Sequence, residues 1–122
     1  MLEHLQPTRV FHYFEEIAAI PHGSGNTAAI SDYCMAFAKA HDLACLQDAL
    51  GNVIIKKPAT AGYEDHPIVI LQGHLDMVCE KAPDLVFDFE KDGLELAVDG
   101  DWSPQASKMG VGKRFSTNKN RE

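Results

Sequence analysis

An apolar run that leads into a histidine and an aspartate constrains this chain most. Ile68–Leu71 contains no polar side chain, and Gly73, His74 and Asp76 follow it closely. A short continuous run rich in β-branched residues is typical of a strand covered on both faces. We therefore predict a buried central strand over residues 68–72. Such strands belong to α/β domains, in which ligands bind beyond the carboxyl ends of the strands.

His74 and Asp76 are the candidate site residues. Residues two apart in an extended chain point to the same side, so the two side chains can meet. A histidine that binds metal through one ring nitrogen usually donates its other N–H to a carboxylate or carbonyl, which fixes its tautomer. By spacing alone, however, the pair is better explained as an exposed turn that binds nothing. The residues around it decide between the two interpretations.

The sequence on both sides of the pair resembles that of a known family. The stretch Gly73–Lys81 resembles the first metal motif of the aminoacyl-histidine dipeptidases, also called cytosolic non-specific dipeptidases, within a larger di-zinc metallopeptidase family. Three other stretches look like the same branch: residues 20–26, 47–60 and 88–102. The resemblance covers residues 1–102.

The resemblance implies a fold, an activity and two residue roles. The fold is a partial three-layer α/β/α zinc-peptidase-like catalytic domain. The activity is zinc-dependent hydrolysis of small dipeptides, including those that end in histidine, with two zinc ions in the complete family site. His74 would be a zinc ligand, and Asp76 would be the catalytic aspartate that orients its imidazole. No residue is assigned to substrate binding.

The resemblance stops after Trp102. The family would continue into a short Gly-Ala-Asp-Asn-Gly stretch whose aspartate bridges the two metals, and later into an adjacent glutamate pair. Here residues 103–122 read differently and carry 1 acidic and 5 basic side chains, against 17 and 6 in residues 1–102. This change predicts two parts, a dipeptidase-like part over 1–102 and an unrelated, disordered basic tail over 103–122.

The missing motifs predict a truncated, inactive form. A catalytic zinc normally has about three protein ligands, so this chain should bind metal weakly or not at all. Its apolar run, left without partners, should make the chain marginally stable and prone to aggregate. The alternative is a small non-enzymatic α/β binding or interaction domain that uses no metal. Neither the oligomeric state nor the preferred dipeptide follows from the sequence.

Composition narrows the partners and the compartment. The net charge of −7 argues against nucleic-acid binding, which needs clustered lysine and arginine. No stretch approaches the ~18 apolar residues of a membrane span, and the N-terminus lacks the pattern of a secretion signal. Three cysteines, an odd number without CxxC spacing, favour a reducing cytoplasm.

Periodicity predicts the remaining elements. Apolar residues at helical spacing predict helices over 8–20 and 27–41, the second capped by Asn26 or Thr27. Short apolar or alternating runs predict further strands over 44–47, 53–56 and 94–98. The turn at Gly23–Asn26 holds Ser24, which lacks the surroundings of a nucleophilic serine. His22, beside that turn, is the one other histidine of interest.

Overall fold

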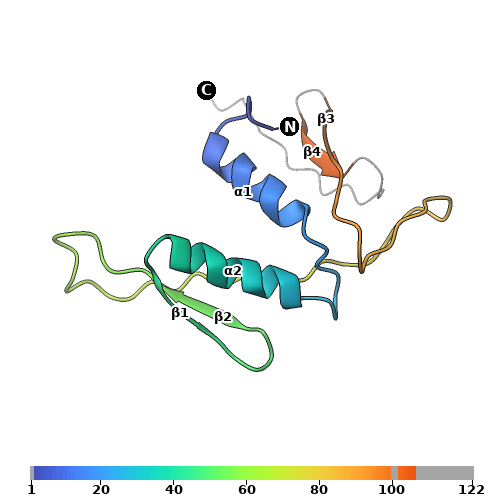
Figure 1. Ribbon diagram of the computed structural model, residues 1–122. Coiled ribbons are helices and arrows are strands. Elements are labelled where there is room, and N and C mark those ends of the chain that lie inside the picture. Colours follow the sequence, from blue (N-terminus) through green and yellow to red (C-terminus); the bar gives the residue numbers. More distant parts are fainter. Residues whose placement is uncertain (1, 100–101, 107–122) are drawn as a thin grey trace.

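The computed structural model describes residues 2–99 and 102–106 and contains two helices and four short strands (Figure 1). The elements are α1 (Thr8–Ala18), α2 (Ala28–Ala40), β1 (Ala44–Gln47), β2 (Val53–Lys56), β3 (Leu96–Asp99) and β4 (Trp102–Ala106). β1 pairs antiparallel with β2, and β3 with β4, so these strands form two separate sheets. The predicted α/β class is confirmed.

Both helices lie where periodicity predicts them, with ends one or two residues shorter. α1 stops at Ala18, and the chain makes one more tight turn before Pro21, in which the Ile20 amide donates to the Ile17 carbonyl. The predicted side-chain cap of α2 is wrong. Thr27 occupies the N-cap position without a side-chain cap bond, and the Asn26 side chain instead donates to the Glu90 carbonyl at 3.2 Å. Asn26 therefore ties its turn to a distant loop.

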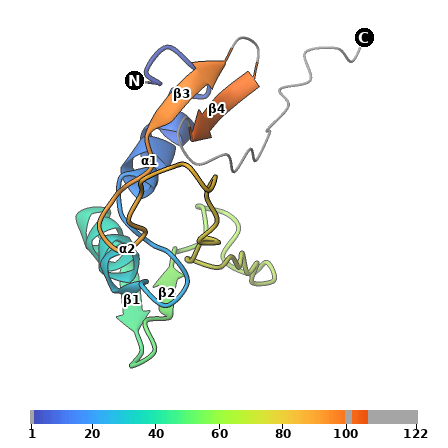
Figure 2. The ribbon, with the colours of Figure 1, turned by 90° about the vertical axis from the view of Figure 1, so that its right-hand side faces the viewer.

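α1 and the β3–β4 hairpin share one small core (Figure 2). Leu2, Ala18 and Leu96 are buried together, and Leu5, Phe11, Phe14 and Leu94 pack against them. The Leu94 amide donates to the Ala18 carbonyl at 2.7 Å, and the backbone approaches so closely that a side chain on Gly93 would clash with the Ala19 carbonyl. β3 begins at residue 96 rather than 94 because the Leu94 amide is committed to α1.

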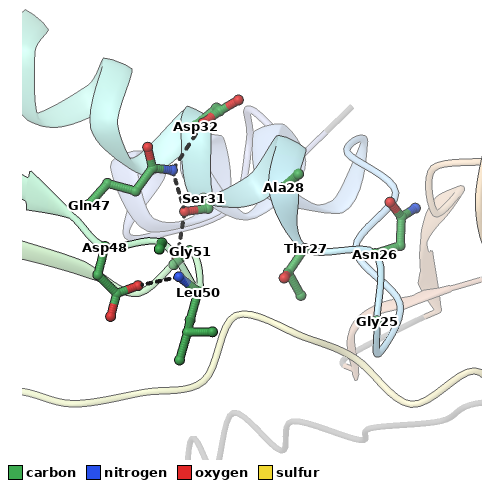
Figure 3. Close-up of a pocket in the computed structure, with 11 residues that line it drawn as sticks. Gly25, Asn26, Thr27, Ala28, Ser31, Asp32, Gln47, Asp48, Leu50 and Gly51 are labelled. Carbon is green, nitrogen blue, oxygen red and sulfur yellow. Dashed lines mark hydrogen bonds between the residues drawn. The ribbon is translucent and has the colours of Figure 1, made fainter.

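α2 packs on the β1–β2 hairpin (Figure 1), and a buried serine fastens the two. The Ser31 hydroxyl donates to the Gly51 carbonyl at 2.7 Å and accepts from the Gln47 amide at 2.7 Å (Figure 3). Gly51 has a φ of +82°, which favours glycine in this turn. Strands 44–47 and 53–56 are thus confirmed at their predicted bounds.

The predicted strand over residues 68–72 is wrong for this structure. Ile68, Val69, Ile70 and Leu71 are 81–93% exposed and belong to no strand. Within the described residues, no backbone hydrogen bond involves residues 68–72. A run of this kind needs a neighbouring strand and a cover on each face, and the described part of the chain supplies neither. The composition of residues 68–72 favours a strand, but it does not show whether neighbouring strands are available to pair with it.

Part of the segment predicted to be a disordered tail, residues 103–106, lies within the described residues. Ser103–Ala106 lie in β4, and residues 96 and 97 pair with residues 106 and 105. The pairing is backbone to backbone, so it does not depend on an apolar pattern of its own. The rest of the predicted tail, residues 107–122, lies outside the described residues.

The exposed segment Ile68–Leu71 predicts self-association. We expect the chain to form concentration-dependent oligomers by light scattering, because unpaired backbone groups flanked by apolar side chains can pair with another copy. Val69→Lys should raise the monomer fraction. Val86→Lys is the matched control, since Val86 is as exposed but lies outside the segment. A parent chain that stays monomeric at all concentrations would contradict this prediction.

The carboxylate of Asp48 predicts an acid-dependent contribution to stability. Hydrogen bonds from the Asn52 side chain and backbone, and from the Leu50 amide, lower the pKa of Asp48. A lowered folded-state pKa stabilises the fold above the unfolded-state value, about 4, and this stabilisation is lost as the pH falls through the folded-state pKa. Asp48→Ala should therefore lower the free energy of unfolding at pH 7, and the difference should shrink below about pH 4.

Urea unfolding across pH measures this effect. Asp84→Ala serves as the control, because Asp84 is exposed and no hydrogen bond to its side chain is described. It should unfold like the parent chain at every pH. An Asp48→Ala difference that stays constant into strong acid would show that the carboxylate charge contributes nothing.

Candidate metal site

His74 and Asp76 meet as the spacing predicts. The Nδ1 atom of His74 lies 3.0 Å from Oδ1 of Asp76 and 2.8 Å from the Asp76 carbonyl oxygen. Both oxygens accept hydrogen bonds and neither donates one, so Nδ1 must carry the proton. In the neutral ring the lone pair then lies on Nε2. This is the tautomer that a histidine needs to bind metal through Nε2.

The pair is positioned by the Gly-Ser turn and not by a sheet. The Met77 amide donates to the His22 carbonyl at 2.9 Å, and the Ser24 amide donates to the Met77 carbonyl at 3.0 Å. These bonds form an isolated parallel bridge between Gly23 and Met77, here called the 23–77 bridge. It joins segments more than fifty residues apart and fixes the chain immediately after Asp76.

Ser24 is the site residue that sequence reasoning missed. Its hydroxyl donates to Oδ2 of Asp76 at 2.6 Å and also lies 3.3 Å from the Met77 carbonyl oxygen. The Ser24 bond, followed by the His74 bond, lowers the pKa of Asp76. The sequence signal was the turn at Gly23–Asn26, in which Ser24 lacks the surroundings of a nucleophile. Nothing in the local sequence indicates that this turn reaches residue 76.

The pair opens into a groove of about 520 Å³. Residues 72–76 form one side, and the turn at Gly25 and Thr27, Cys34 of α2 and the β1–β2 hairpin form the rest. The side chains of His74 and Asp76 are 74% and 40% exposed. A ligand or ion can therefore reach them from solvent, but solvent also screens their charges.

A neighbouring hollow of about 370 Å³ lies between the start of α2 and the β1–β2 turn (Figure 3). Three of its polar side chains already have hydrogen-bond partners. Ser31 donates to the Gly51 carbonyl and accepts from Gln47, and Asp48 accepts from the Leu50 amide within the turn. The figure shows the bonds of Ser31 and Gln47 joining the helix to the hairpin, and the Asp48 bond within the turn. We assign this hollow a structural role.

The residues present fit one metal-ligand position and not a complete catalytic site. Across residues 2–99 and 102–106, no group of three or more histidine, cysteine, aspartate or glutamate side chains converges to hold an ion. His22 does not join the pair, because it is not among the residues that line the groove; its Nδ1 atom bonds to the Ile20 carbonyl. A catalytic zinc normally takes about three protein ligands. The pair offers a single imidazole nitrogen, Nε2 of His74, that an ion could reach.

Comparison with known proteins shows which proteins the chain is similar to. No protein-family model matches the chain. The cytosol non-specific dipeptidase of Escherichia coli (strain K12) is 41% identical over 101 residues, which is 83% of this chain and 21% of that protein. The crystal structure of aminoacylhistidine dipeptidase from Vibrio alginolyticus matches with a TM-score of 0.80 and 36% identity, over 86% of this chain and 22% of that one.

In sequence and in its α/β structure, the chain is similar to dipeptidases. More particularly, the chain is related to the cytosol non-specific, or aminoacylhistidine, dipeptidases, and it spans about a fifth of the length of the relatives it matches. The resemblance predicted from the motifs is confirmed. In the described part of the chain, neither helix has the length and apolar character needed to cross a membrane.

Proposed function

We propose that this chain carries the first metal-ligand position of a zinc dipeptidase lineage. The observation that supports it is the His74–Asp76 pair, whose hydrogen bond leaves Nε2 of His74 as the metal-binding atom. Relatives that share this framework are named as dipeptidases. The reaction of the lineage is then the hydrolysis of small dipeptides, including those ending in histidine, in the cytoplasm, without a nucleic-acid or membrane partner.

In the proposed reaction, the metal and the protein side chains have separate roles. Zinc, when bound in a complete site, polarises the scissile carbonyl and lowers the pKa of a water. Asp76 would hold the proton on Nδ1 of His74 and raise the basicity of the ring, as carboxylate partners of ligating histidines do. Nε2 of His74 would contribute one of the metal bonds.

We further propose that this chain does not hydrolyse dipeptides by itself. One histidine supplies one of the about three ligands of a catalytic zinc. The family's bridging aspartate, expected shortly after Trp102, has no counterpart in residues 103–122. The absence of a general base alone would cost ~10²–10⁴-fold in rate. A dipeptidase part over 1–102 followed by a foreign tail over 103–122 accounts for these features.

A non-enzymatic binding domain is the second candidate, because the chain exposes apolar surface. Leu46 and Ile54 of the β1–β2 hairpin are each more than half exposed, in addition to Ile68–Leu71. Large exposed apolar patches mark interaction sites. The coding DNA after Trp102 discriminates the two candidates. A Gly-Ala-Asp-Asn-Gly stretch and a glutamate pair in another reading frame would establish the truncated dipeptidase, and their absence would favour the binding domain.

Zinc titration tests the proposed site. We expect isothermal titration calorimetry to show weak binding that His74→Ala removes, because a single imidazole forms one bond to the ion. His66→Ala is the matched control, since His66 is another exposed histidine, outside the groove, and its loss should leave the titration unchanged. A submicromolar, His74-dependent affinity would contradict the proposed single-ligand site.

An activity assay tests the proposed inactivity. With zinc or manganese supplied, a histidine-ending dipeptide should remain intact, and turnover that is lost in His74→Ala would refute the proposed inactivity.

A further inference from the structure

The side chains of Ser24, Asp76 and His74 form a continuous hydrogen-bonded row. Ser24 Oγ lies 2.6 Å from one carboxylate oxygen of Asp76, and Nδ1 of His74 lies 3.0 Å from the other. The two oxygens of one carboxylate thus have different partners on opposite sides. Each bond limits how far the carboxylate can rotate, so the serine influences the oxygen that meets the imidazole.

We propose that Ser24 is a positioning residue, which orients Asp76 and through it holds His74 in the Nδ1–H tautomer. The inference deepens the proposed function and rests on the metal-ligand role assigned to His74. Ser24 is no nucleophile here, because its hydroxyl donates to a carboxylate and no histidine nitrogen lies within hydrogen-bond distance of it in the described part of the chain. It acts only through Asp76.

The backbone makes this arrangement specific. The 23–77 bridge fixes the main chain on either side of the contact, since the Ser24 amide bonds to the Met77 carbonyl and the Met77 amide to the His22 carbonyl. Ser24 and Asp76 therefore face each other with little freedom to separate. Asp76 remains 40% exposed, so without the serine its carboxylate would be free to turn toward water. The hydrogen bond from Ser24 therefore restrains the rotation of this exposed carboxylate, as packing restrains a buried one.

Histidine side-chain ¹⁵N spectra of the labelled chain, recorded at a pH where the ring is neutral, test the proposal without metal. The parent chain should show His74 predominantly as the Nδ1–H tautomer. Ser24→Ala should move part of the population toward the Nε2–H tautomer, as should Asp76→Asn, while the Asp76 carbonyl, 2.8 Å from Nδ1, keeps the rest as Nδ1–H. Ser24→Thr keeps the hydroxyl, has room for its methyl group because Ser24 is exposed, and should restore the parent spectrum. Zinc affinity should fall roughly ten-fold in Ser24→Ala, the low end of the effect of losing an outer partner.

Ser31→Ala is the matched control. It removes a serine hydroxyl that fastens α2 to the hairpin, so it should lower stability but leave the His74 tautomer unchanged. If Ser24→Ala does not fold, Ser24→Cys retains the shape with a weaker donor and should give an intermediate tautomer population. An unaltered His74 spectrum in Ser24→Ala or Ser24→Cys would overturn the proposal. Failure of zinc to bind at all would instead refute the proposed function, because the tautomer is measured without zinc.

Discussion

The 23–77 bridge is the interaction on which the site depends. Two backbone hydrogen bonds, from Met77 to His22 and from Ser24 to Met77, join the turn before α2 to the chain after Asp76. Few other described contacts restrain residues 67–76, which otherwise run exposed to solvent. Because backbone groups make the bridge, its geometry does not depend on a side chain that could rotate away. It brings Ser24 to Asp76 and so completes the row that ends at His74.

The rest of the chain divides into two small packed units. α1 with β3–β4 forms one unit, and α2 with β1–β2 forms the other (Figures 1 and 2). The hydroxyl of Tyr33 connects them by donating to Glu16 on α1 at 2.5 Å, and burial together with this carboxylate raises the pKa of Tyr33 to about 12. Among the side chains whose burial the structure describes, each unit buries only a few fully, which is consistent with marginal stability.

Sequence reasoning succeeded where the determinants are local. The helices, β1 and β2 follow from spacing and turn residues, and the hydrogen bond between His74 and Asp76 follows from their two-residue separation. It failed where the outcome depends on distant partners. Ile68–Leu71 has the composition of a central strand, but pairing requires neighbours that composition cannot supply. Ser24 was missed for the same reason, because only the folded chain shows that residues 24 and 76 are in contact. β4 formed because backbone pairing to β3 needs no apolar pattern.

Residue-resolved hydrogen exchange on the dilute, monomeric chain tests the central claim most directly. The claim is that the 23–77 bridge, and not a strand over residues 68–72, holds the His74–Asp76 pair in place. The amides of Met77 and Ser24 should exchange slowly, because both donate backbone hydrogen bonds, while those of Ile68–Leu71 should exchange near the rate of an unfolded chain. Slow exchange at residues 68–71 together with fast exchange at Met77 and Ser24 would contradict the account.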